Sequence, residues 1–246
     1  MISRFIQRYD IDLQEAKIEN PLEYKTFNDF FTRSLKDSAR PINNEVGSAI
    51  CPTDGTITQL GKINSGRIFQ AKGHSYSIIE LLGGSFERAK PFLHGNFLTI
   101  YLSPKNYHRV HMPVNGILKE MVNIPGRLFS VNYLNVRKIP NLFARNKRVA
   151  CVFSTNYGPM IIVFVGAMIV SSIETVWEKD MLQSQKRVIS SKKYDEHCLN
   201  SKIDFLRGEE IGHFNLGSTV IVIFDSRKLI WPKDVSIGKI MKMGNL

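Results

Sequence analysis

Four residues of this sequence could together carry acid–base and nucleophilic chemistry: Asp54, His108, His111 and Ser218. A carboxylate can orient an imidazole, and the imidazole can take the proton of a serine hydroxyl. Chain order is no obstacle, because such triads are defined by geometry. Each signal is weak alone, since Asp before Gly is common in turns and a histidine pair is more often structural. Asp54, His111 and Ser218 therefore form a candidate triad that depends on the fold to bring them together.

The histidine pair lies in the segment YHRVH (107–111), which follows a strand candidate at 97–102. On a strand an odd separation points the two rings to opposite faces, whereas a helical turn lets them share one. Neither an H-E-x-x-H motif nor a Cys/His set accompanies them, so we expect no metal site. The three cysteines, Cys51, Cys151 and Cys198, have no C-x-x-C spacing and are expected to be packing residues in a reducing compartment.

Ser218 directly precedes a strongly apolar run at 220–224. The G-x-S-x-G elbow of α/β-hydrolases is missing, and a strand candidate follows where that fold has a helix. An ordinary α/β-hydrolase is therefore disfavoured. A conventional serine hydrolase that uses the same three residues without cutting itself remains the alternative among enzymes.

The elements that must position these residues are mostly strands. Segments 56–58 and 67–69 flank Asn64-Ser-Gly66 and predict a hairpin. Residues 76–82 predict a short helix that ends at Gly83-Gly84. The remaining strand candidates are rich in Val and Ile, which is typical of strands buried on both faces: 97–102, 116–122, 148–153, 160–170 and 219–224.

Residues 1–36 predict a helical N-terminal segment, in which apolar residues recur with helical spacing and Thr26 caps a helix. The face around Phe5 could lie on a membrane surface, but such a helix more often packs on its own domain. No Pro/Gly/Ser-rich linker divides the chain, and the polar stretch 178–200 is interpreted as a surface excursion. We therefore expect one α+β domain over 1–246, β-rich with a helical N-terminal segment.

The chain is basic, with 33 Lys and Arg against 22 Asp and Glu and a net charge of +11. Such a charge suits a polyanion, either nucleic acid or an anionic membrane, although a solvated Lys-rich surface is an equal alternative. A basic binding module without chemistry would need stacking motifs of the RRM or OB type, which are not found. The N-terminus lacks the apolar stretch of a signal peptide, and the apolar run 161–170 is shorter than the roughly 20 residues of a membrane span.

Taken in order, the motifs of this chain resemble the bacterial pyruvoyl-dependent phosphatidylserine decarboxylases, in the subgroup whose cleavage motif reads LGST. The resemblance covers nearly the whole chain, and the combination is highly specific. The matching segments are TFNDFF (26–31), PTDG (52–55), AKGHSYS (71–77), YLSPKNYHRVHMP (101–113), PNLFARN (140–146), VGA (165–167), SIETVW (172–177), GEEIGHF (208–214) and LGST (216–219).

The resemblance implies that the chain first acts as a serine protease on itself. Asp54 would orient His111, and His111 would deprotonate Ser218, whose oxygen attacks the Gly217 carbonyl. Cleavage between Gly217 and Ser218 would give fragments 1–217 and 218–246 that stay associated, and would convert Ser218 into a pyruvoyl group. That cofactor would form a Schiff base with the serine headgroup and accept the electrons left by carbon dioxide. His108 would then protonate the resulting carbanion.

The resemblance also implies phosphatidylserine in an anionic membrane as substrate, a homodimer, and a peripheral position on the cytoplasmic face of the inner membrane. Nucleic acid is not an expected partner. Arg145, Lys147 and Arg148 beside Leu142 and Phe143 could form a basic membrane-binding patch, because cations near an anionic membrane surface contribute about 1 kcal/mol each.

Overall fold

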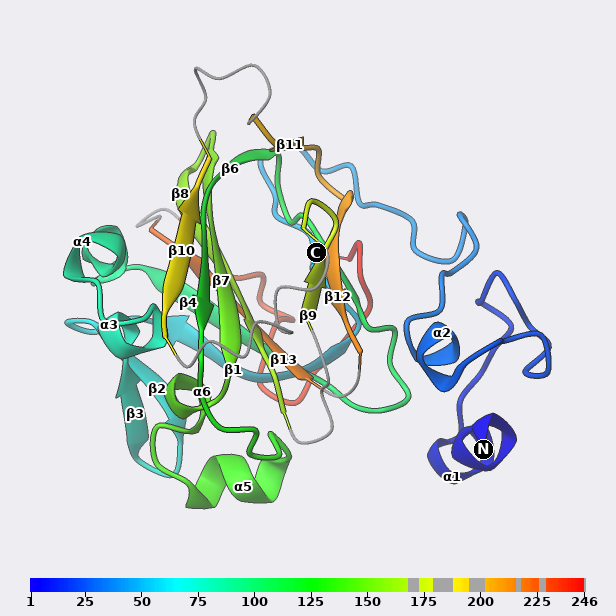
Figure 1. Cartoon of the computed structure of the whole chain (residues 1–246). Helices are drawn as coiled ribbons and strands as arrows, with labels where there is room; N and C mark the ends of the chain where they lie inside the picture. Colours follow the sequence, from blue (N-terminus) through cyan, green and yellow to red (C-terminus); the bar gives the residue numbers. More distant parts are fainter. Residues whose placement is uncertain (168–172, 179–187, 195–201, 216–217, 226–228, 246) are drawn as a thin grey trace.

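The computed structural model describes residues 1–167, 173–178, 188–194, 202–215, 218–225 and 229–245. A large antiparallel sheet dominates them, with the strand order β10-β6-β7-β8-β13-β4-β1-β14 and with β11 beside β6 (Figure 1). The α+β class is confirmed. The strands of this sheet are β1 (Gly55–Lys62), β4 (Asn96–Leu102), β6 (Gly116–Ile124), β7 (Arg148–Thr155), β8 (Gly158–Val165), β10 (Ser190–Lys193), β11 (Asp204–Phe205), β13 (Ser218–Phe224) and β14 (Ile240–Met241).

Two smaller sheets and several short helices surround the large one. A three-stranded sheet has the order β5-β12-β9, and β2 pairs with β3 in a hairpin. Figure 1 shows α3 to α6 and the β2–β3 hairpin on one side of the molecule, and α1 and α2 on the other. These elements are β2 (Arg67–Ala71), β3 (His74–Ser77), β5 (Arg109–His111), β9 (Ile173–Thr175), β12 (Glu210–Phe214), α1 (Ile2–Tyr9), α2 (Phe27–Phe31), α3 (Ile78–Leu81), α4 (Phe86–Ala89), α5 (Tyr133–Lys138), α6 (Leu142–Arg145) and a 3-10 turn at Lys90–Phe92.

Strand β13 lies inside the large sheet, between β4 and β8. All seven of its residues are buried, which explains why its sequence is a continuous apolar run instead of an alternating pattern. A fully buried aliphatic side chain stabilises the fold by about 1.5–3 kcal/mol. The position of β13 is therefore fixed by both neighbours and by its own core residues.

The N-terminal segment 1–36 is helical only in part, so the expectation of a helical segment is right for two short stretches. Helix α1 lacks a side-chain cap, whereas α2 begins with a capping box. The Asp29 backbone N–H donates to Thr26 Oγ1 (3.0 Å), and the Thr26 backbone N–H donates to Asp29 Oδ2 (3.1 Å). This reciprocal pair satisfies two N–H groups that a helix start leaves open, and it confirms the predicted cap at Thr26.

Helix α1 packs on its own domain. Its apolar side chains contact a small buried cluster that includes Phe30, and the rings of Phe5 and Phe27 meet edge to face at 4.9 Å between centroids. The more common of the two interpretations of this amphipathic helix is therefore confirmed.

The predicted hairpin between 56–58 and 67–69 is wrong. Strand β1 pairs with β4 and β14, and β2 pairs with β3 instead. An isolated two-stranded hairpin is marginally stable, whereas β1 within the large sheet has two neighbours and a buried face. The turn itself forms, since Asn64 and Arg67 exchange two backbone hydrogen bonds, but it does not lead into a paired β1 and β2.

The predicted helix at 76–82 is shorter than expected. Strand β3 extends through Ser77, and α3 begins at Ile78 because the Ser77 hydroxyl accepts hydrogen bonds from the first turn. The helix ends before Gly83 and Gly84, as the sequence predicted. Both glycines have a positive φ, which is common just after a helix.

The predicted basic patch at 145–148 is wrong for Arg148. Arg148 is buried, with its guanidinium donating to the carbonyl oxygens of Leu81 (2.7 Å), Glu80 (2.6 Å) and Asn146 (2.7 Å). Leu142 and Phe143 belong to the core. Arg148 is a structural residue because every nitrogen of its guanidinium has a carbonyl acceptor.

Arg148→Met should lower the free energy of unfolding by about 3 kcal/mol, because three buried carbonyls would lose their donor. Arg145→Met, at an exposed position, is the matched control and should change it by less than about 0.5 kcal/mol. Urea unfolding followed by tryptophan fluorescence measures both. Equal midpoints for the two variants would contradict a structural role for Arg148.

Candidate active site

Ser218 is the first residue of β13 and lies opposite Leu102 of β4. It is fully buried, and its Oγ has no hydrogen-bond partner among the described residues. A buried hydroxyl without a partner costs about 1–3 kcal/mol, which a core position would ordinarily avoid with an apolar residue. Gly217, the other half of the predicted cleavage site, lies outside the described residues.

His111 ends β5 and is held at both ring nitrogens. Its Nδ1–H donates to the Gly208 carbonyl oxygen (2.8 Å), and the Tyr107 hydroxyl donates to its Nε2 (3.0 Å). The carbonyl can only accept, so His111 is the neutral imidazole with its proton on Nδ1 and its lone pair on Nε2. Burial lowers the pKa of His111, which keeps the ring neutral and ready to accept a proton.

Asp54 does not hydrogen-bond to His111 in this structure. Its carboxylate accepts from Arg40 at Oδ1 (2.9 Å, from Nε) and Oδ2 (2.5 Å, from Nη2), and from the Met243 backbone N–H (2.9 Å). Burial has the largest effect on the pKa of His111 and lowers it, whereas the charge of Glu210 and, more weakly, that of Asp54 raise it. The expected hydrogen bond between the Asp54 carboxylate and the His111 imidazole is therefore not formed in this structure.

Arg40 is a site residue that the sequence did not reveal. It bridges two carboxylates, donating to Glu15 Oε2 (2.7 Å) as well as to Asp54, and Lys242 donates to Glu15 Oε1 (2.7 Å). Burial alone would lower the pKa of Arg40, but the hydrogen-bonded ion pairs outweigh it and raise that pKa. No motif marks this residue, since its partners come from distant and irregular parts of the chain.

The PTDG segment (52–55) is locked beside β5. The His111 backbone N–H donates to the Pro52 carbonyl oxygen (2.8 Å), and Thr53 Oγ1 donates to the Arg109 carbonyl oxygen (3.1 Å). Gly55 follows because a Cβ there would stand 2.5 Å from the Tyr101 carbonyl oxygen. The Asp-Gly pair therefore reflects close packing of β1 on β4 and not only a turn preference.

His108 lies in the chain just before β5 and is completely buried. Its Nδ1–H donates to the Asn106 carbonyl oxygen (2.7 Å), its ring centroid lies 4.0 Å from that of Phe31, and its Nε2 has no partner among the described residues. Burial, with a smaller effect of the Arg33 charge, lowers the pKa of His108 to about 3. His108 is therefore a neutral base with an unoccupied lone pair.

The two histidines do not share a helical turn. Arg109–His111 is a strand, and the rings of His108 and His111 have different partners. Of the two alternatives that the spacing left open, the extended one holds for Arg109–His111, because β5 pairs with β12. Two distinct environments result, one for each imidazole.

Two backbone pairings place Ser218 and His108 in the same part of the fold. Leu102 lies opposite Ser218, and six residues later the His108 carbonyl oxygen accepts from the Phe214 backbone N–H (3.1 Å). Since Phe214 and Ser218 are only four residues apart in the chain, both residues lie close to this pair of strands.

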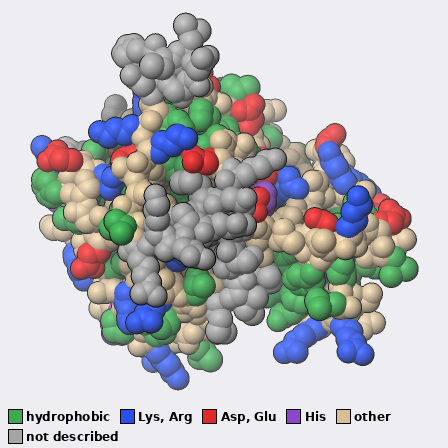
Figure 2. Space-filling view, viewed as in Figure 1, with side chains coloured by type: hydrophobic (Ala, Val, Ile, Leu, Met, Phe, Trp, Pro, Cys, Tyr) green, Lys and Arg blue, Asp and Glu red, His purple; other side chains and the backbone are tan. Residues whose placement is uncertain are grey.

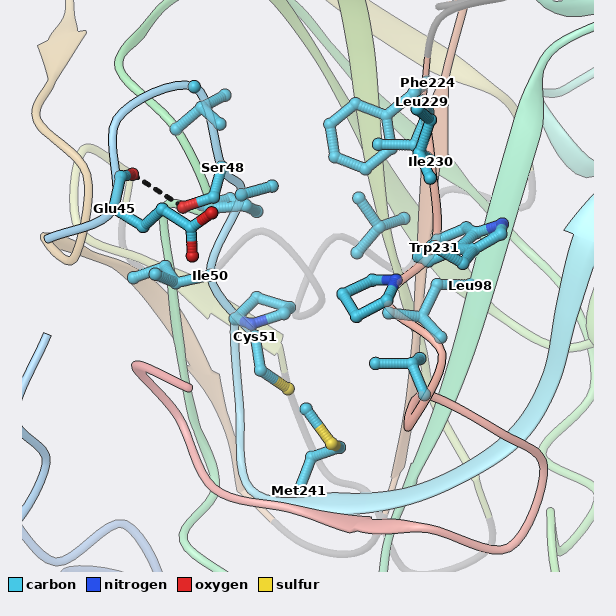
Figure 3. Close-up of a pocket in the computed structure, with 18 of the residues that line it drawn as sticks. Glu45, Ser48, Ile50, Cys51, Leu98, Phe224, Leu229, Ile230, Trp231 and Met241 are labelled. Atoms are coloured by element: carbon cyan, nitrogen blue, oxygen red, sulfur yellow. Dashed lines mark hydrogen bonds between the residues drawn. The ribbon is translucent and has the colours of Figure 1, made fainter. Parts of the chain in front are cut away.

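A cavity of about 790 Å³ lies next to this site but does not contain it (Figure 3). Cys51 and Pro52 line it together with Val222 and Phe224, which share the sheet face of Ser218 because residues two apart point to one side of a strand. In Figure 3, Trp231 and Phe224 lie on one side of the cavity and Cys51 lies on the other. None of the four predicted catalytic residues is among its lining residues.

The described part of the chain contains no group of three or more His, Cys, Asp and Glu side chains that could hold a metal ion. Cys51 and Cys151 are buried free thiols, and burial raises the pKa of Cys51 to about 12. A thiol with so high a pKa stays protonated at neutral pH and is a poor nucleophile. Cys198 lies outside the described residues.

Comparison with known proteins decides the family. A sequence model described as phosphatidylserine decarboxylase matches residues 27–246. The phosphatidylserine decarboxylase proenzyme of Bordetella pertussis is 56% identical over 244 residues, which is 99% of this chain and 82% of the relative. The chain belongs to the phosphatidylserine decarboxylase family.

Organisms of other genera carry similar family members. The proenzyme of Ectopseudomonas mendocina is 51% identical over 246 residues, or 100% of this chain and 85% of the relative. That of Pseudomonas aeruginosa is 52% identical over 244 residues, or 99% and 84%. The family predicted from the sequence motifs is confirmed.

The depressed pKa of His108 predicts an acid-labile fold. Its pKa of about 3 in the folded state lies below the ordinary value of 6.5, so the unfolded chain binds more protons between these pH values. Stability should therefore be complete above pH 6.5 and fall as the pH drops, by up to about 1.4 kcal/mol per unit. Urea unfolding at about pH 7 and at about one and a half units lower, in a Ser218→Ala background, measures this slope.

His108→Gln should make that slope shallower and leave the part that comes from the lowered pKa of His111, whereas His94→Gln, at an exposed position, should leave the slope unchanged. A slope in His108→Gln as steep as in the parent protein would show that other groups cause the acid lability.

Proposed function

We propose that this chain cuts itself at Gly217–Ser218 and then converts phosphatidylserine into phosphatidylethanolamine. Family membership supports the overall reaction, and the buried Ser218 hydroxyl is the observation that supports self-cleavage. A hydroxyl without a partner at the first position of a central strand has no structural purpose, and it costs stability. A nucleophile that must attack its own backbone fits that position.

Self-cleavage needs a base for the Ser218 proton, and His111 suits this role. The Gly208 carbonyl holds the ring proton on Nδ1. The Nε2 lone pair can therefore accept a proton once the Tyr107 hydroxyl no longer donates to it. The Ser218 oxygen then bonds to the Gly217 carbonyl carbon while the peptide C–N bond breaks and the amine takes up a proton, leaving an ester. Loss of the Ser218 α-proton breaks the ester C–O bond and releases the 1–217 carboxylate.

Asp54 contributes through its charge in this scheme. The protonated His111 gains from a nearby carboxylate, and the Asp54 charge raises the His111 pKa without a hydrogen bond. Arg40 holds that carboxylate in place. Asp54 is thus an electrostatic partner of His111 and a structural link to Met243.

Hydrolysis of the new N-terminal residue, with release of ammonia, leaves a pyruvoyl group in place of Ser218. When present, this group supplies a carbonyl that accepts the electron pair left by departing carbon dioxide. The site fits it, because Ser218 is buried away from water and lies in the same part of the fold as His108.

His108 can move a proton in this second reaction. Its Nε2 is unoccupied and its pKa is far below neutral, so it starts as a base and not as an acid. We propose that Nε2 takes a proton from the substrate ammonium and returns it to the substrate α-carbon after carbon dioxide has left. The Asn106 carbonyl and the Phe31 ring hold the imidazole in one orientation for both transfers.

The two fragments are expected to stay together after cleavage. Fragment 218–246 supplies β13 to the centre of the large sheet and β14 to the edge beside β1. Its end is also tied down, since the Cys51 backbone N–H donates to the Asn245 carbonyl oxygen (2.7 Å) and the Met243 backbone N–H donates to Asp54. Removing β13 would expose a fully buried strand to water.

We further propose that the protein works as a peripheral homodimer on the cytoplasmic face of the inner membrane. Among the described helices, none is long and apolar enough to cross a bilayer. Figure 2 shows apolar side chains next to Lys and Arg side chains over α1, a combination suited to an anionic lipid surface. The net charge of +11 points the same way.

Release of carbon dioxide from carboxyl-labelled phosphatidylserine vesicles tests the function. The wild-type protein should release it, and Ser218→Ala should remain uncut and inactive. His108→Gln should still cut itself but lose activity about 100-fold or more, while His94→Gln, at an exposed position, keeps both.

Each outcome of that assay decides one point. A wild-type protein that is cut but releases no carbon dioxide would refute the proposed decarboxylase activity. If the His108→Gln protein is not cut, the proposal that His108 acts only in decarboxylation is refuted, because His108 is then needed for self-cleavage as well.

A further inference from the structure

Arg33 differs from the other buried arginines of the described chain. It is only 5% exposed, and its Nη2 donates to the Lys105 carbonyl oxygen (3.0 Å). Nε and Nη1 are buried without any hydrogen-bond partner among the described residues. Arg40 has carboxylate partners, and each guanidinium nitrogen of Arg148 has a carbonyl acceptor. Of these three arginines, Arg33 alone has guanidinium nitrogens without any partner.

Such an arrangement is costly. Each buried donor without an acceptor costs about 1–3 kcal/mol, and a buried cation without a counter-ion costs more. Burial lowers the pKa of Arg33, as expected for a desolvated charge. The charge of Asp54 opposes this effect only in part, and its carboxylate makes its hydrogen bonds to Arg40 and Met243 instead of to Arg33.

The position of Arg33 links it to the active site. Its guanidinium lies over the Phe30 ring (5.4 Å to the centroid), and the adjacent Phe31 contacts the His108 ring. The Arg33 charge contributes to lowering the pKa of His108, after the larger effect of burial. Its bond to Lys105 fixes it on the connection 103–107, which begins directly after Leu102, the residue opposite Ser218.

We propose that Arg33 binds the phosphodiester of the lipid headgroup through its unused Nε–H and Nη1–H donors. This proposal rests on the proposed function. A guanidinium matches the paired oxygens of a phosphodiester or a carboxylate. Pairing with the substrate carboxylate would oppose the reaction, since it would stabilise the charge that must leave as carbon dioxide. The phosphodiester is present in substrate and product alike, so binding it does not hinder catalysis.

Arg33→Met tests this proposal on the mature enzyme with dihexanoyl phosphatidylserine as substrate and dihexanoyl phosphatidylethanolamine as product inhibitor. The variant should raise KM about 10- to 100-fold and weaken product inhibition by the same factor, with kcat changed less than about threefold. Arg145→Met, at an exposed arginine, should change none of these values.

A structural role is distinguished by stability and maturation. Arg33→Met removes an unpaired buried charge, so the Tm of the Ser218→Ala protein should not fall when it is added, and self-cleavage should persist in the single variant. A lowered Tm, an uncut variant, or an unchanged KM would overturn the proposal. Loss of kcat with unchanged product inhibition would instead assign Arg33 to the carboxylate. Inactivity of the wild-type protein would refute the proposed function, which separates that failure from a failure of the Arg33 assignment.

Discussion

The pairing of β13 between β4 and β8 is the constraint on which the rest of this structure depends. It buries all seven residues of the strand and fixes Ser218 opposite Leu102. The hydroxyl then lies in an apolar interior at the end of the strand, where no described group satisfies it. Because cooperative sheet packing supplies the stability, the fold can tolerate a reactive group that weakens it locally.

Charges around this strand are distributed in a complementary way. The ion pair of Arg40 and Asp54 connects the N-terminal segment, the PTDG segment and the C-terminal end near Met243. Beside it, His108 and His111 are both kept neutral by burial. A charged ion pair therefore lies near two neutral histidines. Each imidazole donates to a backbone carbonyl, which fixes its tautomer.

Much of this could be predicted from the sequence, because long apolar runs and ordered motifs are strong signals. The runs at 160–170 and 219–224 predicted buried central strands, of which the first ends earlier than predicted, at Val165, and Thr26 predicted a helix cap. The predicted pairing of 56–58 with 67–69 was wrong, since β1 pairs over a long distance with β4, and the spacing of His108 and His111 could not decide between a strand and a turn because the pairing of β5 with β12 decides it. Arg40 and Arg33 escaped notice because their contacts exist only after folding.

Denaturing intact-mass analysis of the purified protein beside its Ser218→Ala variant tests the central claim most directly. The account predicts two fragments that divide between residues 217 and 218, with a pyruvoyl-blocked terminus on the smaller one and an uncut variant. A single intact chain of 246 residues from the active, natively purified protein would contradict it.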